Sequence, residues 1–448
     1  MKKVDFENGS ITGNILQTAF PMLVAQVLHL LYSIVDRIYI GRIPGTGTDA
    51  LGAVGLCFPI IILITGFTNM FGMGGAPLFS IQLGKKKKEE ARQVLCTAFR
   101  LLIMVSFAIT VTGELFGGPL LKLFGAGEEE LATSLSYLRI YLTGTVPLML
   151  STGMNPYITA MGFAVVGMLS VTVGAVANLL LDPVFIFVFG MGVEGAALAT
   201  VISQVLSMML VLFFLFGKKN EFRPSFGFSF PFAWDIVGLG LAPFIMQVTN
   251  SLVQIACNQM LMHLGGMTFV SVMTIISSVR SILDVPVMAV TEGTSPIISY
   301  NYGARRPDRV RKAFIVMMML AVPYTFLTWI AVLVRPVWFI RIFSTDREIL
   351  SDASRALHLY FAAFIFQSLQ YSGQTVFKAL NKRKQAIFFS LLRKAVLVVP
   401  LTYLLPLAFH LGTDGVFLAE PVSNVIGGIA CFTTMLITIL PELKAMEN

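Results

Sequence analysis

The stretch that decides the fold is residues 51–83, LGAVGLCFPIIILITGFTNMFGMGGAPLFSIQL, which contains no charged side chain. An α-helix rises about 1.5 Å per residue, so about 20 such residues cross the roughly 30 Å hydrocarbon core of a bilayer. The whole chain is similar, because 56% of its 448 residues are hydrophobic and only 12% are charged. An ordinary soluble domain has about 25% charged residues. The composition therefore predicts a protein embedded in lipid.

Further apolar runs divide the rest of the chain into segments of membrane-spanning length. Together with 51–83, the runs lie at 15–40, 92–117, 131–160, 162–189, 193–216, 233–263, 268–301, 309–337, 348–380, 384–409 and 413–440. Backbone polar groups in lipid must be satisfied within their own segment, which favours helices for such runs. We therefore predict an all-α polytopic membrane protein with twelve transmembrane helices.

Basic residues gather in the loops that follow most even-numbered runs, at 85–92, 218–223, 305–312 and 378–384. Cytoplasmic loops of membrane proteins carry an excess of Lys and Arg. This rule predicts that both termini are cytoplasmic. The net charge of +8 is explained by these loops, so we expect no nucleic-acid partner.

The chain contains an internal repeat. The pattern Gly-x-x-Pro-x-x-Ser-x-x-x-Gly of residues 74–84 recurs at 293–303, a shift of 219 residues. Six predicted helices separate the copies, so both halves cross the membrane in the same sense, as in parallel-repeat carriers. We predict two six-helix lobes related by pseudo-twofold symmetry: an N-lobe at 1–216, a cytoplasmic linker at 217–232 and a C-lobe at 233–448.

Several motifs resemble those of the multidrug and toxic compound extrusion (MATE) family, in its bacterial branch typical of Gram-positive organisms. They are Pro21 and Asp36, the stretch 293–303, Asn178-x-x-x-Asp182-Pro183, and Gly195-Ala-Ala-Leu-Ala-Thr200. The resemblance covers essentially the whole chain and implies a protein of the bacterial plasma membrane. It implies a secondary active multidrug exporter that exchanges H⁺ or Na⁺ for amphipathic organic cations by alternating access, with no cofactor beyond the coupling ion.

The resemblance also implies roles for individual residues of the N-lobe. The family's cation-coupling site is matched here by Asp36, Asn178, Asp182 and Thr200, and Tyr32 is expected to line the pocket. Pro21 is expected at the bend of the first helix. The seventh and tenth runs hold amides where other branches have acidic residues, so we expect no coupling site in the C-lobe.

Asp36 and Asp182 also stand out without the resemblance. An ionisable residue in a span costs about 2.5–3.5 kcal/mol to insert, so it should face protein or water, and it often marks an ion path. Both lie at similar depth in their runs, and Pro183 beside Asp182 eases bending. With the oxygens of Asn178 and Thr200 they suit H⁺ or Na⁺ equally. The alternative is that Asp36 simply pairs with Arg37.

Four further residues are candidates for contact with the substrate. Asn155 lies in the fourth run between Met154 and Met161, and methionine suits an adaptable apolar pocket. Glu292 lies near the inner end of the eighth run. It is expected either to contact substrate or to neutralise a basic loop.

Other polar residues have simpler structural interpretations. Arg280 and Asp284, four residues apart, are predicted to form an intrahelical ion pair. Glu194 and Asp414 occupy equivalent helix N-termini, where a carboxylate complements the helix dipole. His29 shares a helix face with Asp36 and is either an internally bonded residue or a proton relay.

The main alternative function is a lipid-linked oligosaccharide flippase of the same superfamily. Flippases of that kind commonly have a strongly cationic cavity, whereas the central spans here are read as holding acids and amides. An enzyme is not expected, because the sequence contains no G-x-S-x-G, H-E-x-x-H or Walker A motif. We expect a monomer in the lipid bilayer that transports small-molecule cationic drugs.

Overall fold

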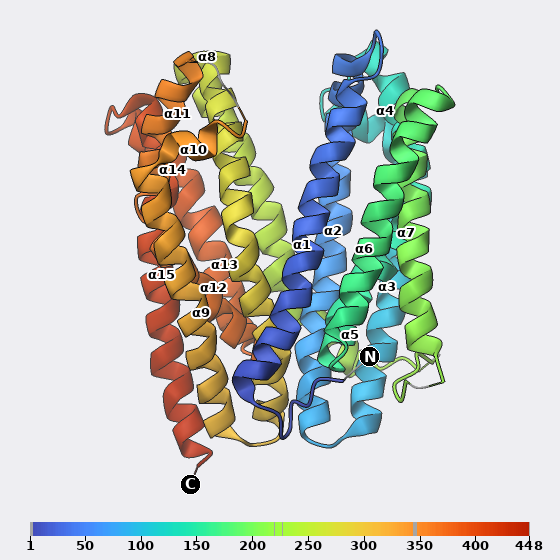
Figure 1. Ribbon diagram of the computed structural model, residues 1–448, viewed down its shortest axis with the longest axis vertical. Coiled ribbons are helices and arrows are strands. Elements are labelled where there is room, and N and C mark those ends of the chain that lie inside the picture. The colour runs from blue at the N-terminus through green and yellow to red at the C-terminus, as the bar shows by residue number, and fades with distance from the viewer. Residues whose placement is uncertain (1–2, 219, 226, 344–346, 448) are drawn as a thin grey trace. The chain divides into compact units, whose positions relative to one another are not determined.

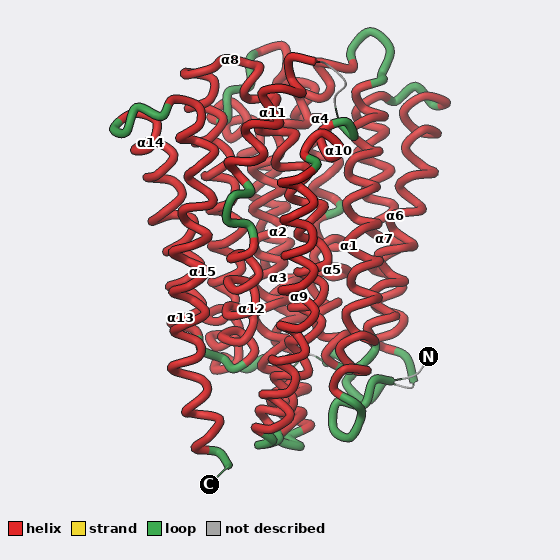
Figure 2. The backbone as a smooth tube through the Cα atoms, turned by 60° about the vertical axis from the view of Figure 1, so that its left-hand side comes forward, coloured by secondary structure: helices red, strands yellow, loops and turns green. Residues whose placement is uncertain are grey.

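The computed structural model describes residues 3–218, 220–225, 227–343 and 347–447. Within these ranges every regular element is a helix and there is no strand (Figures 1 and 2). The chain forms two compact units, Met1–Asp5 with Pro21–Gly240, and Phe6–Phe20 with Leu241–Asn448. The division falls inside α1 (Ile11–Gly41) at Pro21 and inside α8 (Phe230–Gly303) after Gly240.

The first unit contains most of α1 and the six helical elements that follow it. These are α2 (Gly47–Gly84), α3 (Lys88–Leu123), α4 (Glu128–Thr143), α5 (Thr145–Ala160), α6 (Ala164–Pro183) with the π-helical turn η1 (Val184–Val188), and α7 (Gly192–Phe216). Helices α6 and α7 lie side by side, and α2 packs against both α3 and α5 (Figure 1).

The second unit contains most of α8 and the remaining helices. These are α9 (Pro307–Val334), α10 (Pro336–Ile340), α11 (Arg347–Tyr360), α12 (Ile365–Ala379), α13 (Arg383–Leu391), the π-helical turn η2 (Leu392–Val398), α14 (Val399–Leu407) and α15 (Gly412–Ala445). The long helix α15 packs against α12, α14 and η2, so it brings residues of several spans together.

The predicted twelve spans are confirmed. In the described part of the chain, nine helices are long and apolar enough to cross a membrane, and α11 with α12 forms a further span bent by 50°. Helix α8 counts twice, because Gly266 (φ 69°, ψ −165°) interrupts it between the predicted runs 233–263 and 268–301. Helices α4 and α5, with only Gly144 between them, supply the last span.

Two predicted runs are not continuous helices in the structure. The predicted run 309–337 ends at Val334, and Arg335 is not helical (φ −134°, ψ 56°). Proline disfavours helical geometry in the residue before it, so Pro336 starts the short helix α10 instead. The predicted run 348–380 is broken at 361–364, between α11 and α12.

The segment between α7 and α8 is a loop of the first unit. Lys88 Nζ lies 2.9 Å from Glu221 Oε2, and this hydrogen bond lowers the pKa of the Glu221 carboxyl. Lys219, one of the basic residues expected here, lies outside the described residues. The predicted linker at 217–232 and the lobes at 1–216 and 233–448 stay predictions.

Close helix contacts in the first unit depend on small residues. A Cβ added to Gly72 would lie 2.8 Å from the Gly153 carbonyl oxygen, so α2 and α5 approach backbone to backbone. Small residues serve this purpose in membrane helices generally. Nearby, the fully buried Tyr157 donates its hydroxyl hydrogen to the Phe71 carbonyl at 2.8 Å. These contacts hold α5 in place beside the candidate site.

Candidate functional site

Two carboxyl groups meet in the first unit. Asp182 is fully buried one residue before the end of α6, and Asp36 lies on α1. Their side chains are close enough for a hydrogen bond once one of them carries a proton. Pro183 has no N–H to continue the α-helical pattern, and the π-helical turn η1 follows it at once. The local backbone around Asp182 is therefore irregular.

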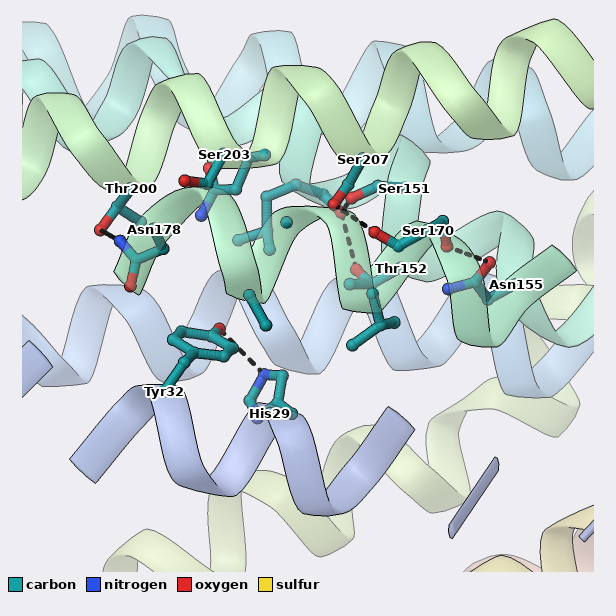
Figure 3. A pocket seen from close by; sticks show the side chains of 15 residues that line it. His29, Tyr32, Ser151, Thr152, Asn155, Ser170, Asn178, Thr200, Ser203 and Ser207 are labelled. Carbon is teal, nitrogen blue, oxygen red and sulfur yellow. Dashed lines mark hydrogen bonds between the residues drawn. The ribbon is translucent and has the colours of Figure 1, made fainter. Parts of the chain in front are cut away.

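Asn178 joins Asp182 to α7. Its Nδ2 donates to Asp182 Oδ1 at 3.1 Å and to Thr200 Oγ1 at 3.4 Å. Asn178 lies one helical turn before Asp182, so both side chains share a face of α6. Figure 3 shows Asn178 beside Thr200, with Tyr32 on the facing helix α1. The structure thus brings together all four residues predicted for cation coupling.

Three oxygens of this cluster lack hydrogen-bond donors. Asp36 Oδ1, Asp182 Oδ2 and Asn178 Oδ1 are all buried, and none accepts a hydrogen bond from the described residues. A buried acceptor without a partner costs about 1–3 kcal/mol, and an unpaired charge costs more. Three such oxygens close together form a set that a proton or a hard cation would satisfy.

Arg37 does not pair with its neighbour. Its guanidinium carbon lies 4.9 Å from the centre of the Phe58 ring. Asp36 Oδ1 has no hydrogen-bond partner among the described residues, although the Arg37 charge still acts on the Asp36 carboxyl. The geometry therefore favours the ion-binding interpretation of Asp36 over the simple structural pair.

The first unit contains two neighbouring cavities, and the smaller one adjoins the cluster. One, of about 60 Å³, is bounded by Asn178 and Thr200 and also by Tyr32 and His29. The other, of about 200 Å³, shares His29 and Asn155 with the first. Asn155 accepts a hydrogen bond from Ser170 at 3.3 Å and lines both cavities (Figure 3). Tyr32 and Asn155 are thus placed where a substrate could reach them.

His29 is bonded within its own helix. Its Nε2 lies 3.2 Å from the Tyr32 hydroxyl, and the two rings meet edge to face with centres 4.9 Å apart. This contact favours the internally bonded interpretation over a proton relay. The hydrogen bond also fixes the position of Tyr32 against the smaller cavity.

Three substrate candidates lie away from both cavities. Met154 and Met161 are buried, with 0% and 3% exposure, and line neither space. Their proposed contact with substrate stays a prediction without support from the geometry. Glu292 lies in the second unit, where Lys378 is the charged group that acts on it. This arrangement favours the neutralising role over substrate contact.

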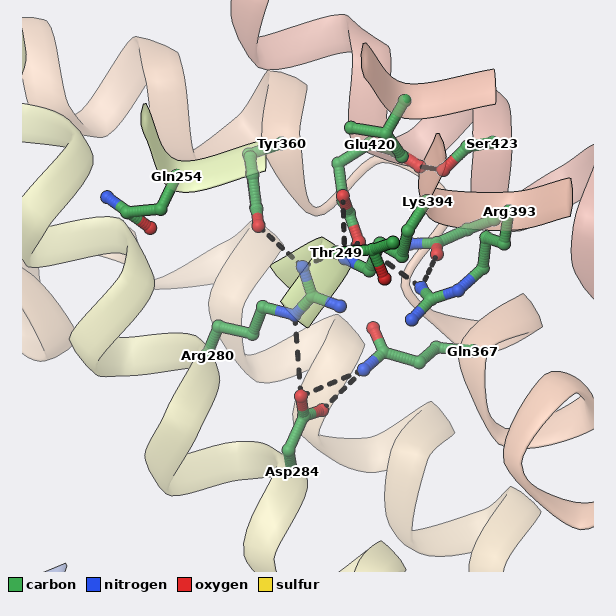
Figure 4. Close-up of polar contacts among 12 residues, drawn as sticks. Thr249, Gln254, Arg280, Asp284, Tyr360, Gln367, Arg393, Lys394, Glu420 and Ser423 are labelled. Carbon is green, nitrogen blue, oxygen red and sulfur yellow. Dashed lines mark hydrogen bonds and ion pairs between the residues drawn. The ribbon is translucent and has the colours of Figure 1, made fainter. Parts of the chain in front are cut away.

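The second unit contains a buried ionic cluster that the sequence analysis missed (Figure 4). Glu420 Oε1 lies 2.6 Å from Arg280 Nη1, 2.9 Å from Lys394 Nζ and 3.2 Å from Arg393 Nη1. The expectation that central spans hold only acids and amides is therefore wrong. A signal was present, because Arg393, Lys394 and Glu420 each interrupt an apolar run.

The predicted pair of Arg280 and Asp284 is part of this cluster. Arg280 Nε lies 3.3 Å from Asp284 Oδ2, but the same guanidinium also binds Glu420 and donates to Tyr360 at 2.6 Å. Gln367 Nε2 donates to both Asp284 oxygens, at 2.8 and 2.9 Å. The intrahelical pair exists, yet it links several spans rather than standing alone.

Glu194 and Asp414 lie in the first turns of α7 and α15, as predicted. Neither helix has a side-chain hydrogen bond at its N-cap. Asp414 instead forms an ion pair with Arg355 of α11. Both positions suit the dipole interpretation, and Asp414 has an additional tie to its neighbour.

Comparison with known proteins agrees with this fold. The MatE family model matches residues 21–184 and 243–404. The chain is 25% identical to an FAD transporter of Shewanella oneidensis over 93% of each chain, and 22% identical to the multidrug export protein MepA of Staphylococcus aureus over 91% of this chain and 90% of MepA.

A solved structure of a multidrug resistance MATE family transporter superposes with a TM-score of 0.92 at 22% identity, covering 100% of this chain and 99% of the other. That likeness concerns the fold. The family model covers well over half of the chain, in both repeated halves. This protein is therefore a member of the MatE family.

Proposed function

We propose that this protein is a secondary active exporter that exchanges H⁺ or Na⁺ for amphipathic organic cations by alternating access. The observation that carries the proposal is the set of buried, unpartnered oxygens on Asp36, Asp182 and Asn178. Such a set gains stability when a cation arrives. The relative MepA is named as a multidrug export protein, which supports the same substrate class.

The coupling follows from competition for negative charge. An ion or proton bound at Asp36 and Asp182 neutralises the carboxylates, whereas a lipophilic cation gains from the unneutralised pair because it loses hydration on entry. Two ligands that prefer different states of one site weaken each other's binding, so the coupling free energy between them is positive. Loading the ion from outside would then favour release of the organic cation outward.

H⁺ and Na⁺ remain alternatives. For Na⁺, the residues that would hold the ion are Asp36, Asn178, Asp182 and Thr200, through carboxylate, amide and hydroxyl oxygens. For H⁺, the two carboxyl groups alone suffice, since their contact can hold one shared proton. The cytoplasmic placement of both termini and the monomeric state belong to this proposal as well.

The test is transport by purified protein in proteoliposomes under separately imposed pH and Na⁺ gradients. A fluorescent lipophilic cation should be exported under one of the two gradients. An uncharged isostere of the same scaffold should be exported poorly. Equal export of the cation and its isostere, or export without either gradient, would contradict the proposal.

A second candidate is export of an anionic cargo. The specific observation that favours it is the cluster of Arg280, Arg393 and Lys394 in the second unit, which holds more positive than negative side chains. The relative from Shewanella oneidensis is named as an FAD transporter, and FAD carries a pyrophosphate. A lipid-linked oligosaccharide flippase was disfavoured because the central spans were expected to lack cations. Since this cluster contains three cations, the flippase alternative also stays open.

A further inference from the structure

The ionic cluster of the second unit is not neutral. It contains the cations Arg280, Arg393 and Lys394 but only the carboxylates Asp284 and Glu420. The charged groups that act on Glu420 are these same three cations. Counted with all five side chains ionised, the cluster has one excess positive charge within the membrane span, where an uncompensated charge is costly.

The cluster also has unused hydrogen-bonding atoms. Arg393 donates only through Nη1, to Glu420 and to Asn424, and no described residue accepts from its Nε or Nη2. Gln367 Oε1 and Gln370 Oε1 are buried acceptors without a donor, on side chains that are 2% and 1% exposed. A ligand that matches this set would offer oxyanion oxygens to Arg393 and hydroxyl or N–H hydrogens to the two glutamines.

The backbone accounts for the concentration of charge. Arg393 and Lys394 lie in the π-helical turn η2, a rare geometry that is frequent at functional sites. Both side chains are buried although they are neighbours in sequence. Arg280 and Asp284 are more exposed, at 13% and 11%, than Arg393 and Glu420, at 4% and 3%. The side of the cluster formed by α8 is thus less deeply buried than the side formed by η2 and α15.

We propose that this cluster binds an oxyanion, a phosphate or carboxylate group, of a cargo molecule that also carries hydroxyl groups. Arginine with lysine is a frequent pairing for such groups, and the guanidinium fork matches two oxygens at once. The proposal rests on the proposed function only in taking the protein as a transporter. It concerns a site separate from Asp36 and Asp182.

The test compares FAD with riboflavin, which has the same ring system and ribityl hydroxyls but lacks the pyrophosphate and the adenosine, and it uses inorganic pyrophosphate to isolate the contribution of the phosphates. Binding of each to the purified full chain in lipid nanodiscs is measured by equilibrium dialysis, together with the melting temperature. FAD should bind at least tenfold more tightly than riboflavin and should raise the melting temperature. Inorganic pyrophosphate should displace FAD.

The variant Arg393→Gln should lower FAD affinity at least tenfold and leave riboflavin binding unchanged. Arg335→Gln is the matched control, because the Arg335 guanidinium lies over Trp338, 5.5 Å from its ring centre, outside the cluster. It should bind FAD as the native protein does. An effect of equal size in both variants would overturn the site.

The comparison of FAD, riboflavin and pyrophosphate on the native protein needs no variant, so misfolding of Arg393→Gln cannot hide the answer. Equal binding of the two flavins overturns the inference. Gradient-driven export of a fluorescent cation, measured on the same preparation, reports separately on the proposed function. Intact cation export without any preference for FAD would overturn this inference alone.

Discussion

Removing the Glu420 carboxylate should destabilise the second unit severely. Glu420 is 3% exposed, and its Oε1 contacts Arg280, Arg393 and Lys394 within 3.2 Å. The substitution Glu420→Gln keeps the shape of the side chain but removes its charge. With every charged group ionised, the net charge of the cluster then rises from +1 to +2. Asp284 is the carboxylate of the cluster that remains to balance its three cations.

The expected loss follows from the burial of the partners. Removing one member of a buried, hydrogen-bonded ion pair costs about 3–5 kcal/mol, because the remaining charge stays buried and uncompensated. For a unit of about 150–250 residues, each kcal/mol lowers the melting temperature by about 2–4 °C, so the total decrease should be roughly 6–20 °C. The measurement is thermal unfolding of the purified protein in detergent.

Glu442→Gln on the same helix is the matched control. Its partner Lys382 lies at 2.6 Å, but the two side chains are 30% and 27% exposed. Exposed pairs contribute about 0–1 kcal/mol, so the melting temperature should change by only a few degrees. Adding Lys394→Met to Glu420→Gln should restore part of the loss by removing one surplus cation. Equal decreases in the two single variants, or a further decrease in the double variant, would refute the reasoning.

The remaining predictions concern coupling, topology and packing. Asp36→Asn and Asp182→Asn should each abolish gradient-driven export while the protein still folds, and the double variant should lose little more activity than either single variant. Full ion-coupled transport by either single variant would rule out the shared site. Single cysteines placed at 85–88 in a variant without the four native cysteines should not react with an impermeant thiol reagent applied to intact cells. Labelling from outside would contradict the predicted orientation. Gly75→Ala should destabilise the first unit by about 1–3 kcal/mol, because the added Cβ would overlap the Tyr157 hydroxyl. Adding Tyr157→Phe should relieve part of this cost, and strictly additive effects of the two substitutions would contradict the overlap.

The candidate site could be predicted in part because its residues carry a local signal. Asp36 and Asp182 are carboxylates in apolar runs, and Asn178 lies one helical turn before Asp182 on the same face. That Thr200 completes the cluster required the resemblance, since nothing local links a threonine of one helix to an asparagine of another. Met154 shows the opposite limit, because residue type alone could not tell a cavity wall from a packed core.

The sequence by itself determined the fold class, the number of spans and the repeat, because hydrophobic length and charge asymmetry act segment by segment. Only the tertiary structure decided which ionisable groups meet. The buried ionic cluster combines Arg280 of α8, Arg393 and Lys394 of η2, and Glu420 of α15. These charges are concentrated in one place only once the helices are packed together. Contacts between residues that are distant along the chain depend on how each helix is rotated about its own axis. The hydrophobic periodicity of the sequence does not determine this rotation.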